Sequence, residues 1–189
     1  MGLCRRWWRW LAGGALAAAA ALVLAWLLLP FPRERLACYP AATLLLDRDG
    51  APLRLRLGPN DTDCRLRYHP DYDRDWIAKA VVAAEDQRFW QHHGVDPLAL
   101  GRAVGQNLWG RRVVSGASTI TTQVVRLTQP RRRTLPTKAV ELFRALQLER
   151  ILDKRAILEQ YLNRAPFGAN LVGVEAASRR YFGKAPGDL

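Results

Sequence analysis

The run from Leu11 to Leu29 constrains this chain most, because nineteen consecutive residues carry no charge. The run is rich in alanine and leucine and is followed by Pro30. At about 1.5 Å per residue, a helix of this run reaches roughly 28 Å, close to the hydrocarbon thickness of a bilayer. We therefore expect a retained transmembrane anchor over residues 11–29, preceded by a basic tail over residues 1–10.

The flanks of this run predict its orientation. Arg5, Arg6 and Arg9 precede it among three tryptophans; positive charge stays on the cytoplasmic side of a membrane, and aromatic rings favour the interface. The rest of the chain is then expected to be exported. A cleavable signal peptide is the alternative, which the length of the run and the charges over 33–35 disfavour.

Size and charge bound the remainder of the chain. Its 189 residues leave about 150 beyond the anchor, enough for one domain with its own core. The net charge of +12 predicts an anionic partner: nucleic acid, anionic lipid or a phosphorylated substrate. Residues 110–170 hold twelve Lys/Arg and four Asp/Glu, although a solvated basic face is the alternative.

The three cysteines predict no disulfide framework. Cys4 precedes the apolar run, whereas Cys38 and Cys64 follow it. A Cys38–Cys64 disulfide and two free thiols both remain open, and no Cys/His cluster predicts zinc.

Patterning beyond the anchor predicts a short hairpin and then helices. Over residues 43–57, leucines alternate with arginines after a DRDG turn at 47–50. From Trp76 the apolar residues follow helical spacing, and Asp96-Pro97 predicts the start of a helix that ends at Gly110. Further helices are expected over 118–127, 137–152, 154–163 and 171–182, with a stop at Gly183. The fold class is mainly α, with a linker and β-hairpin over 30–70 and a helical domain over 71–189.

The first candidate motif is EDQRFWQHHG at 85–94. Glu85 falls near the edge of the apolar stripe of its helix, where partial desolvation favours a general base, whereas Asp86 points away from the stripe. A surface glutamate is the alternative for Glu85. We interpret His92 as a structural hydrogen-bonding residue and predict no metal at His92-His93.

The second motif is GASTITTQ at 116–123. Its glycine allows close backbone approach, and its hydroxyls and amide offer uncharged donors. Ser118 is expected to cap a helix whose amino end faces an anion, and Arg126 lies one turn beyond Thr122. An ordinary Ser/Thr-rich turn is the alternative.

The third motif gathers cations before Glu141. Three arginines at 131–133 and Lys138 are placed to stabilise the charge that builds up on a departing diphosphate. Glu141 shares a helix face with Lys138, so it either orients that lysine or contacts the reacting sugar or pyrophosphate; a surface ion pair is the alternative. The fourth motif, KRAILEQYLN at 154–163, is mostly core and supports the site by packing.

Together the four motifs resemble glycosyltransferase family 51, the peptidoglycan polymerase domain of class A penicillin-binding proteins and monofunctional transglycosylases. The family patterns are approximately EDxxFxxHxG, GxSTITQQ, RKxxE and KxxILxxYLN, and the match runs from about Trp76 to Leu189. RALQLE at 144–149 and APFGAN at 165–170 look most like the penicillin-binding protein 1C branch. The chain departs from these patterns at three positions. Thr122 occupies the position where the family usually has the first glutamine of its pair, and Thr137 replaces the arginine before Lys138. Arg126 occupies a position where lysine is often found.

The resemblance implies a lysozyme-like glycosyltransferase 51 domain, C-terminally incomplete over 71–189 because the closing helices and any transpeptidase domain are expected beyond Leu189. The implied acceptor is lipid II and the implied donor is an undecaprenyl-diphosphate-linked glycan. Glu85 is the implied catalytic base and Glu141 assists at the donor. The implied substrate-binding residues are Asp86, Phe89, Ser118, Thr119, Gln123, Arg126, Arg133 and Lys138. A divalent cation at the pyrophosphate stays open, although no DxD cluster is visible.

These expectations place the domain in the periplasm of a bacterium, anchored in the inner membrane beside other cell-wall synthesis proteins. Nucleic acid is disfavoured as a partner because the basic region then lies outside the cytoplasm. A lytic transglycosylase is a second enzyme class, which needs no diphosphate-binding cations. An anchored, catalytically impaired module that binds lipid-linked precursor or partner proteins is the non-catalytic alternative.

Overall fold

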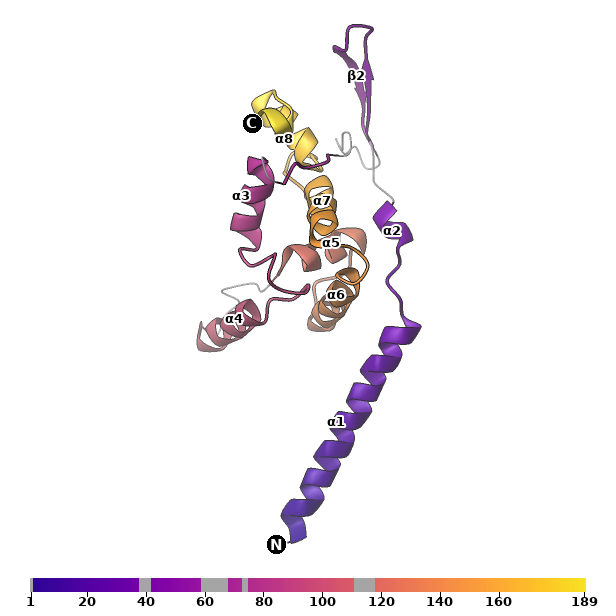
Figure 1. The fold of residues 1–189 in the computed structure, drawn as a ribbon, viewed down its shortest axis with the longest axis vertical. Coiled ribbons are helices and arrows are strands. Elements are labelled where there is room, and N and C mark those ends of the chain that lie inside the picture. Colours follow the sequence, from indigo (N-terminus) through magenta and orange to yellow (C-terminus); the bar gives the residue numbers. More distant parts are fainter. Residues whose placement is uncertain (1, 38–41, 59–67, 73–74, 111–117) are drawn as a thin grey trace. The chain divides into compact units, whose positions relative to one another are not determined.

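A computed structural model of the chain describes residues 2–37, 42–58, 68–72, 75–110 and 118–189. Cys38, Cys64 and Gly116 lie outside the described residues, and so does the disulfide that the first two are able to form. The chain divides into two units, Met1–Pro32 and Arg33–Leu189 (Figure 1).

The first unit is the helix α1, Gly2–Leu28. Alanine and leucine have the highest helix propensities, which accounts for a helix through the whole uncharged run, and Pro30 cannot continue it. Of the helices in the described part of the chain, none has both the length and the apolarity needed to cross a membrane. The anchor over 11–29 therefore stays a prediction.

The second unit begins with the short helix α2, Glu34–Ala37, followed by the expected hairpin. Strands β1, Thr43–Leu46, and β2, Pro52–Arg56, pair antiparallel. In the turn, the Asp47 carboxylate accepts hydrogen bonds from the amides of Asp49 and Ala51, and Gly50 has a φ of 82° that suits glycine. The hairpin prediction and its DRDG turn are confirmed.

The helices of the second unit are α3 (Trp76–Glu85), α4 (Pro97–Gly110), α5 (Ile120–Thr128), α6 (Leu135–Leu148), α7 (Lys154–Arg164) and α8 (Val174–Phe182), followed by the 3₁₀ turn η2 (Pro186–Asp188). Asp96 caps α4 through the amides of Leu98 and Ala99, as the sequence predicts. Gly183 ends α8 with a φ of 70°, which confirms the predicted stop. A mainly helical domain with one small sheet is the observed fold class.

Several helix boundaries differ from the sequence prediction: α5 begins at Ile120 instead of 118, and α6 ends at Leu148 instead of 152. The starts of α6 and α8 differ for visible local reasons. Helix α6 begins at Leu135 instead of 137, because Thr134 accepts a hydrogen bond from the Thr137 amide and caps the helix two residues earlier. Helix α8 begins at Val174 instead of 171, because Gly173 adopts a φ of 86°. Both differences come from backbone geometry that the apolar periodicity does not report.

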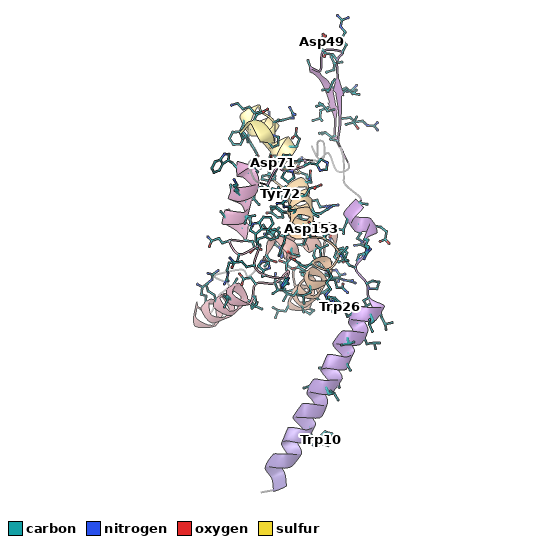
Figure 2. The ribbon with its side chains drawn as sticks, viewed as in Figure 1. Trp10, Trp26, Asp49, Asp71, Tyr72 and Asp153 are labelled. Atoms are coloured by element: carbon teal, nitrogen blue, oxygen red, sulfur yellow. The ribbon has the colours of Figure 1, made fainter. Side chains whose placement is uncertain are left out.

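The core of the second unit forms around α5, which packs against both α6 and α7. Ile120 and Val124 of α5 are fully buried, as are Leu148 of α6 and Leu158 and Leu162 of α7. The core role expected for the fourth motif is thereby confirmed. Asp153 caps α7 by accepting from the Ala156 amide (Figure 2), so this helix starts where the fourth motif starts.

Candidate active site

Glu85 is the last residue of α3, and its side chain is exposed. The partial desolvation expected for Glu85 is wrong, because the helix ends at this residue and leaves its carboxylate uncovered. Gln123, in the first turn of α5, donates a hydrogen bond of 2.8 Å from Nε2 to Oε2 of Glu85. The carboxylate is therefore accessible and oriented by a neighbouring helix.

Asp86 is buried, which corrects its predicted outward direction, but it also lines the cavity described below, so its contact with substrate stays a prediction. His92 Nε2 lies 3.0 Å from each of the two carboxylate oxygens, and the Ile120 amide donates to Oδ2 at 3.0 Å. Asp86 thus joins the end of α3 to the first turn of α5, where free amides favour a carboxylate. The structural hydrogen-bonding role expected for His92 is confirmed.

Phe89 has no exposed surface, and its contact with substrate stays a prediction. Its ring meets the ring of Trp90 edge-on at 5.0 Å, and the Lys154 ammonium lies 4.4 Å from its centroid. Lys154 also pairs with Glu149, whose Oε1 accepts a hydrogen bond from Thr121. Phe89 therefore packs inside the domain and supports the elements that carry Glu85 and Gln123.

The N-cap of α5 is Thr119, not the predicted Ser118. Thr119 Oγ1 donates to the Gly94 carbonyl and accepts from the Thr122 amide, while Thr122 Oγ1 accepts from the Thr119 amide. This is a capping box, in which Thr122 makes the reciprocal bond. Thr119 is only 2% exposed and has this structural role, while its role in substrate binding stays a prediction.

Four polar side chains between the second motif and the end of the third meet in what we call the cation cluster. They are Ser118, Arg126, Lys138 and Glu141. Arg126 donates from Nε and Nη2 to the two oxygens of Glu141, at 3.0 Å each. Lys138 Nζ lies 3.5 Å from Glu141 Oε2 and donates to Ser118 Oγ at 3.0 Å. The bidentate contact fixes the plane of the arginine and thus the direction of its charge.

The charged groups of the cation cluster shift one another's pKa values. Burial opposes ionisation of Glu141, but the hydrogen bond and charge of Arg126 and the charge of Lys138 outweigh it and lower the pKa of Glu141. Burial likewise lowers the pKa of Lys138, which Glu141 partly offsets. The hydrogen bond to Glu141 raises the pKa of Arg126. Two cations therefore share one carboxylate, which leaves net positive charge to attract an anion.

Arg133 lies exposed in the segment between α5 and α6. In the part of the chain that the structure describes, the hydrogen bonds and ion pairs of the cation cluster do not include Arg133. The structure thus brings together six of the predicted residues around one site and leaves Arg133 beside it. The six are Glu85, Gln123, Ser118, Arg126, Lys138 and Glu141.

A cavity of about 320 Å³ is lined by Glu85, Asp86 and Ser118, so its wall includes the serine that bonds to the cations of the cluster. Arg88 and Arg102 also line this cavity, and the sequence analysis missed both. Arg88 pairs with Asp96, the cap of α4, and Arg102 lies on α4. Arg88 lies in the turns that follow α3, outside any helix, so helical periodicity does not mark it.

Tyr161 is a further residue that the sequence analysis assigned only to the core. Its side chain is mostly buried, and burial followed by the charge of Glu85 raises its pKa to about 12. Tyr161 therefore keeps its hydroxyl proton near neutral pH, within electrostatic range of the exposed carboxylate. Its place in the YLN sequence of the fourth motif is the signal that marks it.

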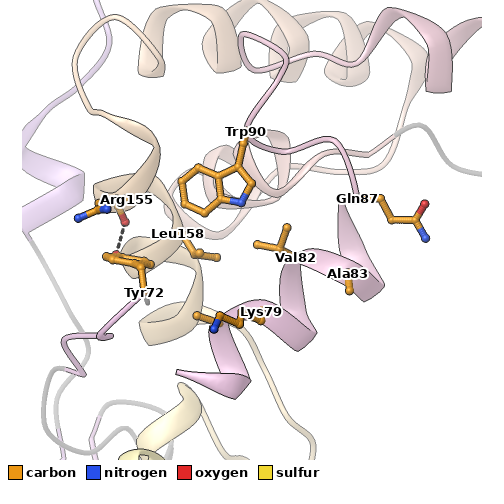
Figure 3. A pocket seen from close by; sticks show the side chains of 9 residues that line it. Tyr72, Lys79, Val82, Ala83, Gln87, Trp90, Arg155 and Leu158 are labelled. Atoms are coloured by element: carbon orange, nitrogen blue, oxygen red, sulfur yellow. Dashed lines mark hydrogen bonds between the residues drawn. The ribbon is translucent and has the colours of Figure 1, made fainter. Parts of the chain in front are cut away.

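A larger cavity of about 720 Å³ lies on the other side of α3 and is mainly apolar (Figure 3). Tyr72 and Trp90 meet edge-on at 6.4 Å in its wall, and Tyr72 donates a hydrogen bond to the Arg155 carbonyl. Gln87 lines both cavities. The smaller cavity is lined by Glu85, Asp86 and Ser118 of the motifs, so these residues, and not the greater volume, identify the candidate active site.

Comparisons with known proteins agree with the arrangement of the motifs. The sequence model of a family described as Transglycosylase matches residues 66–189. Penicillin-binding protein 1C of Escherichia coli is 44% identical over 148 residues, which cover 78% of this chain and 19% of that protein. A biosynthetic peptidoglycan transglycosylase of Thiobacillus denitrificans is 38% identical over 190 residues, covering 98% of this chain and 80% of that protein.

A second biosynthetic peptidoglycan transglycosylase, from Laribacter hongkongensis, is 39% identical over 147 residues, covering 76% of this chain and 63% of that protein. The chain spans between 13% and 19% of the length of the first three penicillin-binding proteins it matches.

Proposed function

The chain belongs to the transglycosylase family, and from this premise we propose that it is a peptidoglycan glycosyltransferase. It polymerises lipid II into glycan strands by inverting transfer and releases undecaprenyl diphosphate. The observation that carries the proposal is the single cavity lined by Glu85 and by Ser118, the serine bonded to Lys138. The cavity offers a base, and Ser118 in its wall is hydrogen-bonded to the fixed cations Lys138 and Arg126.

Glu85 acts on the acceptor. Its carboxylate takes the proton of the 4-hydroxyl on the N-acetylglucosamine of lipid II, and that oxygen attacks the anomeric carbon of the donor. The new glycosidic bond forms as the bond from that carbon to the diphosphate oxygen breaks, and the diphosphate leaves with the electron pair. A single displacement inverts α to β, which needs a base and a leaving-group site on opposite faces of the sugar. The hydrogen bond from Gln123 supports this role by orienting the carboxylate.

Arg126 and Lys138 act on the donor, where negative charge accumulates as the diphosphate departs. Cations that are fixed before the reaction stabilise such charge without reorganisation in the transition state. Glu141 supplies that fixation, because it is 7% exposed and both of its oxygens face the cations of the cluster. We therefore assign Glu141 to orienting Arg126 and Lys138 instead of contacting the sugar. Arg133 is a further cation of the donor side, and a divalent cation at the pyrophosphate stays a prediction.

Attachment to the bacterial inner membrane, with the domain in the periplasm, completes the proposal. The support is the uncharged run over 11–29 together with the arginines before it. Trp10 and Trp26 lie near the two ends of that run on α1 (Figure 2), where amphipathic rings suit the two interfaces. A lipid-linked substrate is presented at such a surface.

Glu85→Gln tests the proposal on the full chain in detergent with purified lipid II. The variant keeps the shape of the side chain but cannot accept a proton, so we expect glycan synthesis to fall by about 10²–10⁴-fold. Glu175→Gln is the matched control, because Glu175 pairs with Arg179 on α8, outside the residues of the site. Synthesis by Glu85→Gln at the control rate contradicts the proposal, and a wild-type chain that binds lipid II without turnover supports the non-catalytic alternative.

A further inference from the structure

The segment between α5 and α6 presents an uncovered leucine among uncovered cations. Residues 130–136 are all exposed, and Leu135 has 88% of its surface exposed. From 129 to 140 the sequence contains four Lys/Arg and no Asp/Glu. A single exposed leucine needs no explanation, but a leucine within a run of cations has the composition of an interfacial membrane contact.

The positive charge of this segment extends onto the adjoining helix. Burial, and after it the charge of Arg131, lowers the pKa of Arg144 on α6. The two guanidinium groups therefore lie within electrostatic range of each other. Clustered positive charges repel one another, and contact with an anionic surface reduces that repulsion.

The backbone holds this segment in a defined position beside the active site. Leu135 is the first residue of α6, and Thr134 caps that helix through the Thr137 amide and hydroxyl. Lys138 of the cation cluster follows Leu135 by three residues, so it is less than one helical turn, about 5 Å, along the axis. A surface that contacts Leu135 therefore comes close to the group that binds the diphosphate.

We propose that Arg131, Arg132 and Leu135 dock this domain on a bilayer of anionic lipids. The leucine side chain inserts among the headgroups, and the two guanidinium groups bind lipid phosphates. The inference deepens the proposed function and rests on it, because it assigns the surface that holds the site at the depth of a lipid-linked diphosphate. We call this set the docking surface.

An anionic bilayer fits the docking surface better than a soluble polyanion does. Arginine binds phosphate through two parallel hydrogen bonds, and a polybasic segment is attracted to anionic headgroups within a Debye length. A soluble polyanion satisfies the arginines but leaves Leu135 in water. A bilayer satisfies both kinds of side chain.

The test uses the full chain in lipid nanodiscs, with and without phosphatidylglycerol, in a background whose three cysteines are serine. Leu135→Cys carries an environment-sensitive fluorophore, and lipid-borne quenchers report its contact with the bilayer. We expect blue-shifted, quenched emission in the anionic discs and loss of both effects in high salt. Leu146→Cys, on the same helix and 41% exposed, is the control position and should remain unquenched.

Charge variants separate the docking surface from net charge. Arg131→Gln combined with Arg132→Gln should lower the equilibrium constant for contact with the anionic bilayer by about tenfold or more. Arg179→Gln combined with Arg180→Gln removes the same charge from α8 and should leave the contact unchanged. Amide hydrogen exchange over 131–135, slowed by anionic discs in the unlabelled wild-type chain, provides a second readout that needs no substitution.

A fluorophore at 135 that stays in water in both kinds of disc overturns the docking surface. An equal loss of bilayer contact in the two double charge variants overturns it too. So does protection of the amides over 131–135 by soluble polyphosphate that equals the protection by anionic discs. None of these readouts involves turnover. Their failure therefore leaves the glycosyltransferase proposal standing, whereas an active Glu85→Gln variant contradicts that proposal without affecting the lipid contact.

Discussion

The two halves of the candidate active site differ in how firmly their charged groups are held. Glu85 is exposed at the end of a helix and receives a hydrogen bond from the neutral amide of Gln123. Glu141 is buried, and two cations surround it, one of them through a bidentate contact. The base is open to solvent, whereas the leaving-group site is held in place by ion pairs. We call the half with Glu85 the accessible side and the half with Glu141 the braced side.

This difference matches the different demands of the proposed reaction. The base must meet a hydroxyl carried by an incoming sugar, so its carboxylate has to be reachable from the cavity. The cations must already point at the diphosphate when charge develops on it, because any reorganisation then adds to the barrier. Substitutions that leave Glu85 in place are expected to have the largest effect on the braced side, an intermediate effect at the connection between the sides, and the smallest effect on the accessible side.

Among the variants that leave Glu85 in place, the largest effect is expected from Glu141→Gln. The amide cannot balance Arg126 and Lys138, so the cations lose their fixed geometry and transfer should fall by about 10²-fold. The side chains of Arg126 and Lys138 are 30% and 31% exposed, so water screens them and the loss of unfolding free energy should be only about 2 kcal/mol. Initial rates on lipid II and thermal unfolding in detergent measure the two effects.

Glu175→Gln again serves as the control for Glu141→Gln, and it should change stability by less than about 0.5 kcal/mol. A Glu141→Gln variant with wild-type rate and wild-type stability contradicts the braced side of the comparison.

The same substitution has a pH signature. The pKa of Glu141 is lower in the folded protein, so its stabilisation is present above the ordinary pKa of a glutamate. That stabilisation is lost as the pH falls through the lower pKa of the folded state. Melting temperatures should therefore drop less steeply on acidification in Glu141→Gln than in the wild type, and parallel pH profiles refute the assigned ion pairs.

An intermediate effect is expected from Asp86→Asn, which disturbs the connection between the two sides. Asp86 holds His92 and the Ile120 amide together, and a neutral amide weakens both contacts. We expect a loss of about 1–3 kcal/mol in unfolding free energy and about a tenfold slower transfer. Unchanged stability combined with a raised KM for lipid II instead places Asp86 on the substrate.

The smallest effect is expected from Gln123→Leu on the accessible side. This variant keeps the volume of the side chain but removes the hydrogen bond that orients Glu85. We expect kcat to fall severalfold with KM nearly unchanged, because an orienting contact acts after binding. Steady-state kinetics separate the two parameters, and a raised KM at constant kcat assigns Gln123 to donor binding.

Local sequence signals predicted the helix boundaries that depend on local chemistry. Asp96-Pro97 and Gly183 mark helix ends through side-chain caps and a left-handed backbone, and both are confirmed. The family resemblance, based on the spacing of the four motifs, is confirmed as well. These features are encoded in a few adjacent residues.

Burial within a motif could not be predicted from the sequence. Phe89 and Thr119 stand near residues of the cavity, yet both are buried in the domain, and Asp86 lines the cavity although it is almost fully buried. Gln123 meets Glu85 across 38 residues, and Lys138 meets Ser118 across 20. Such pairings depend on how α5 packs against its neighbours, which helical periodicity does not specify.

The affinity of Glu85→Gln and Lys138→Ala for a diphosphate-linked prenyl glycan tests the division between base and cations most directly. The two variants are compared with the wild-type chain by displacement of a phosphoglycolipid inhibitor. The account predicts that Glu85→Gln binds within about twofold of the wild type, whereas Lys138→Ala binds about tenfold or more weakly. Weakened binding by Glu85→Gln together with unchanged binding by Lys138→Ala contradicts it.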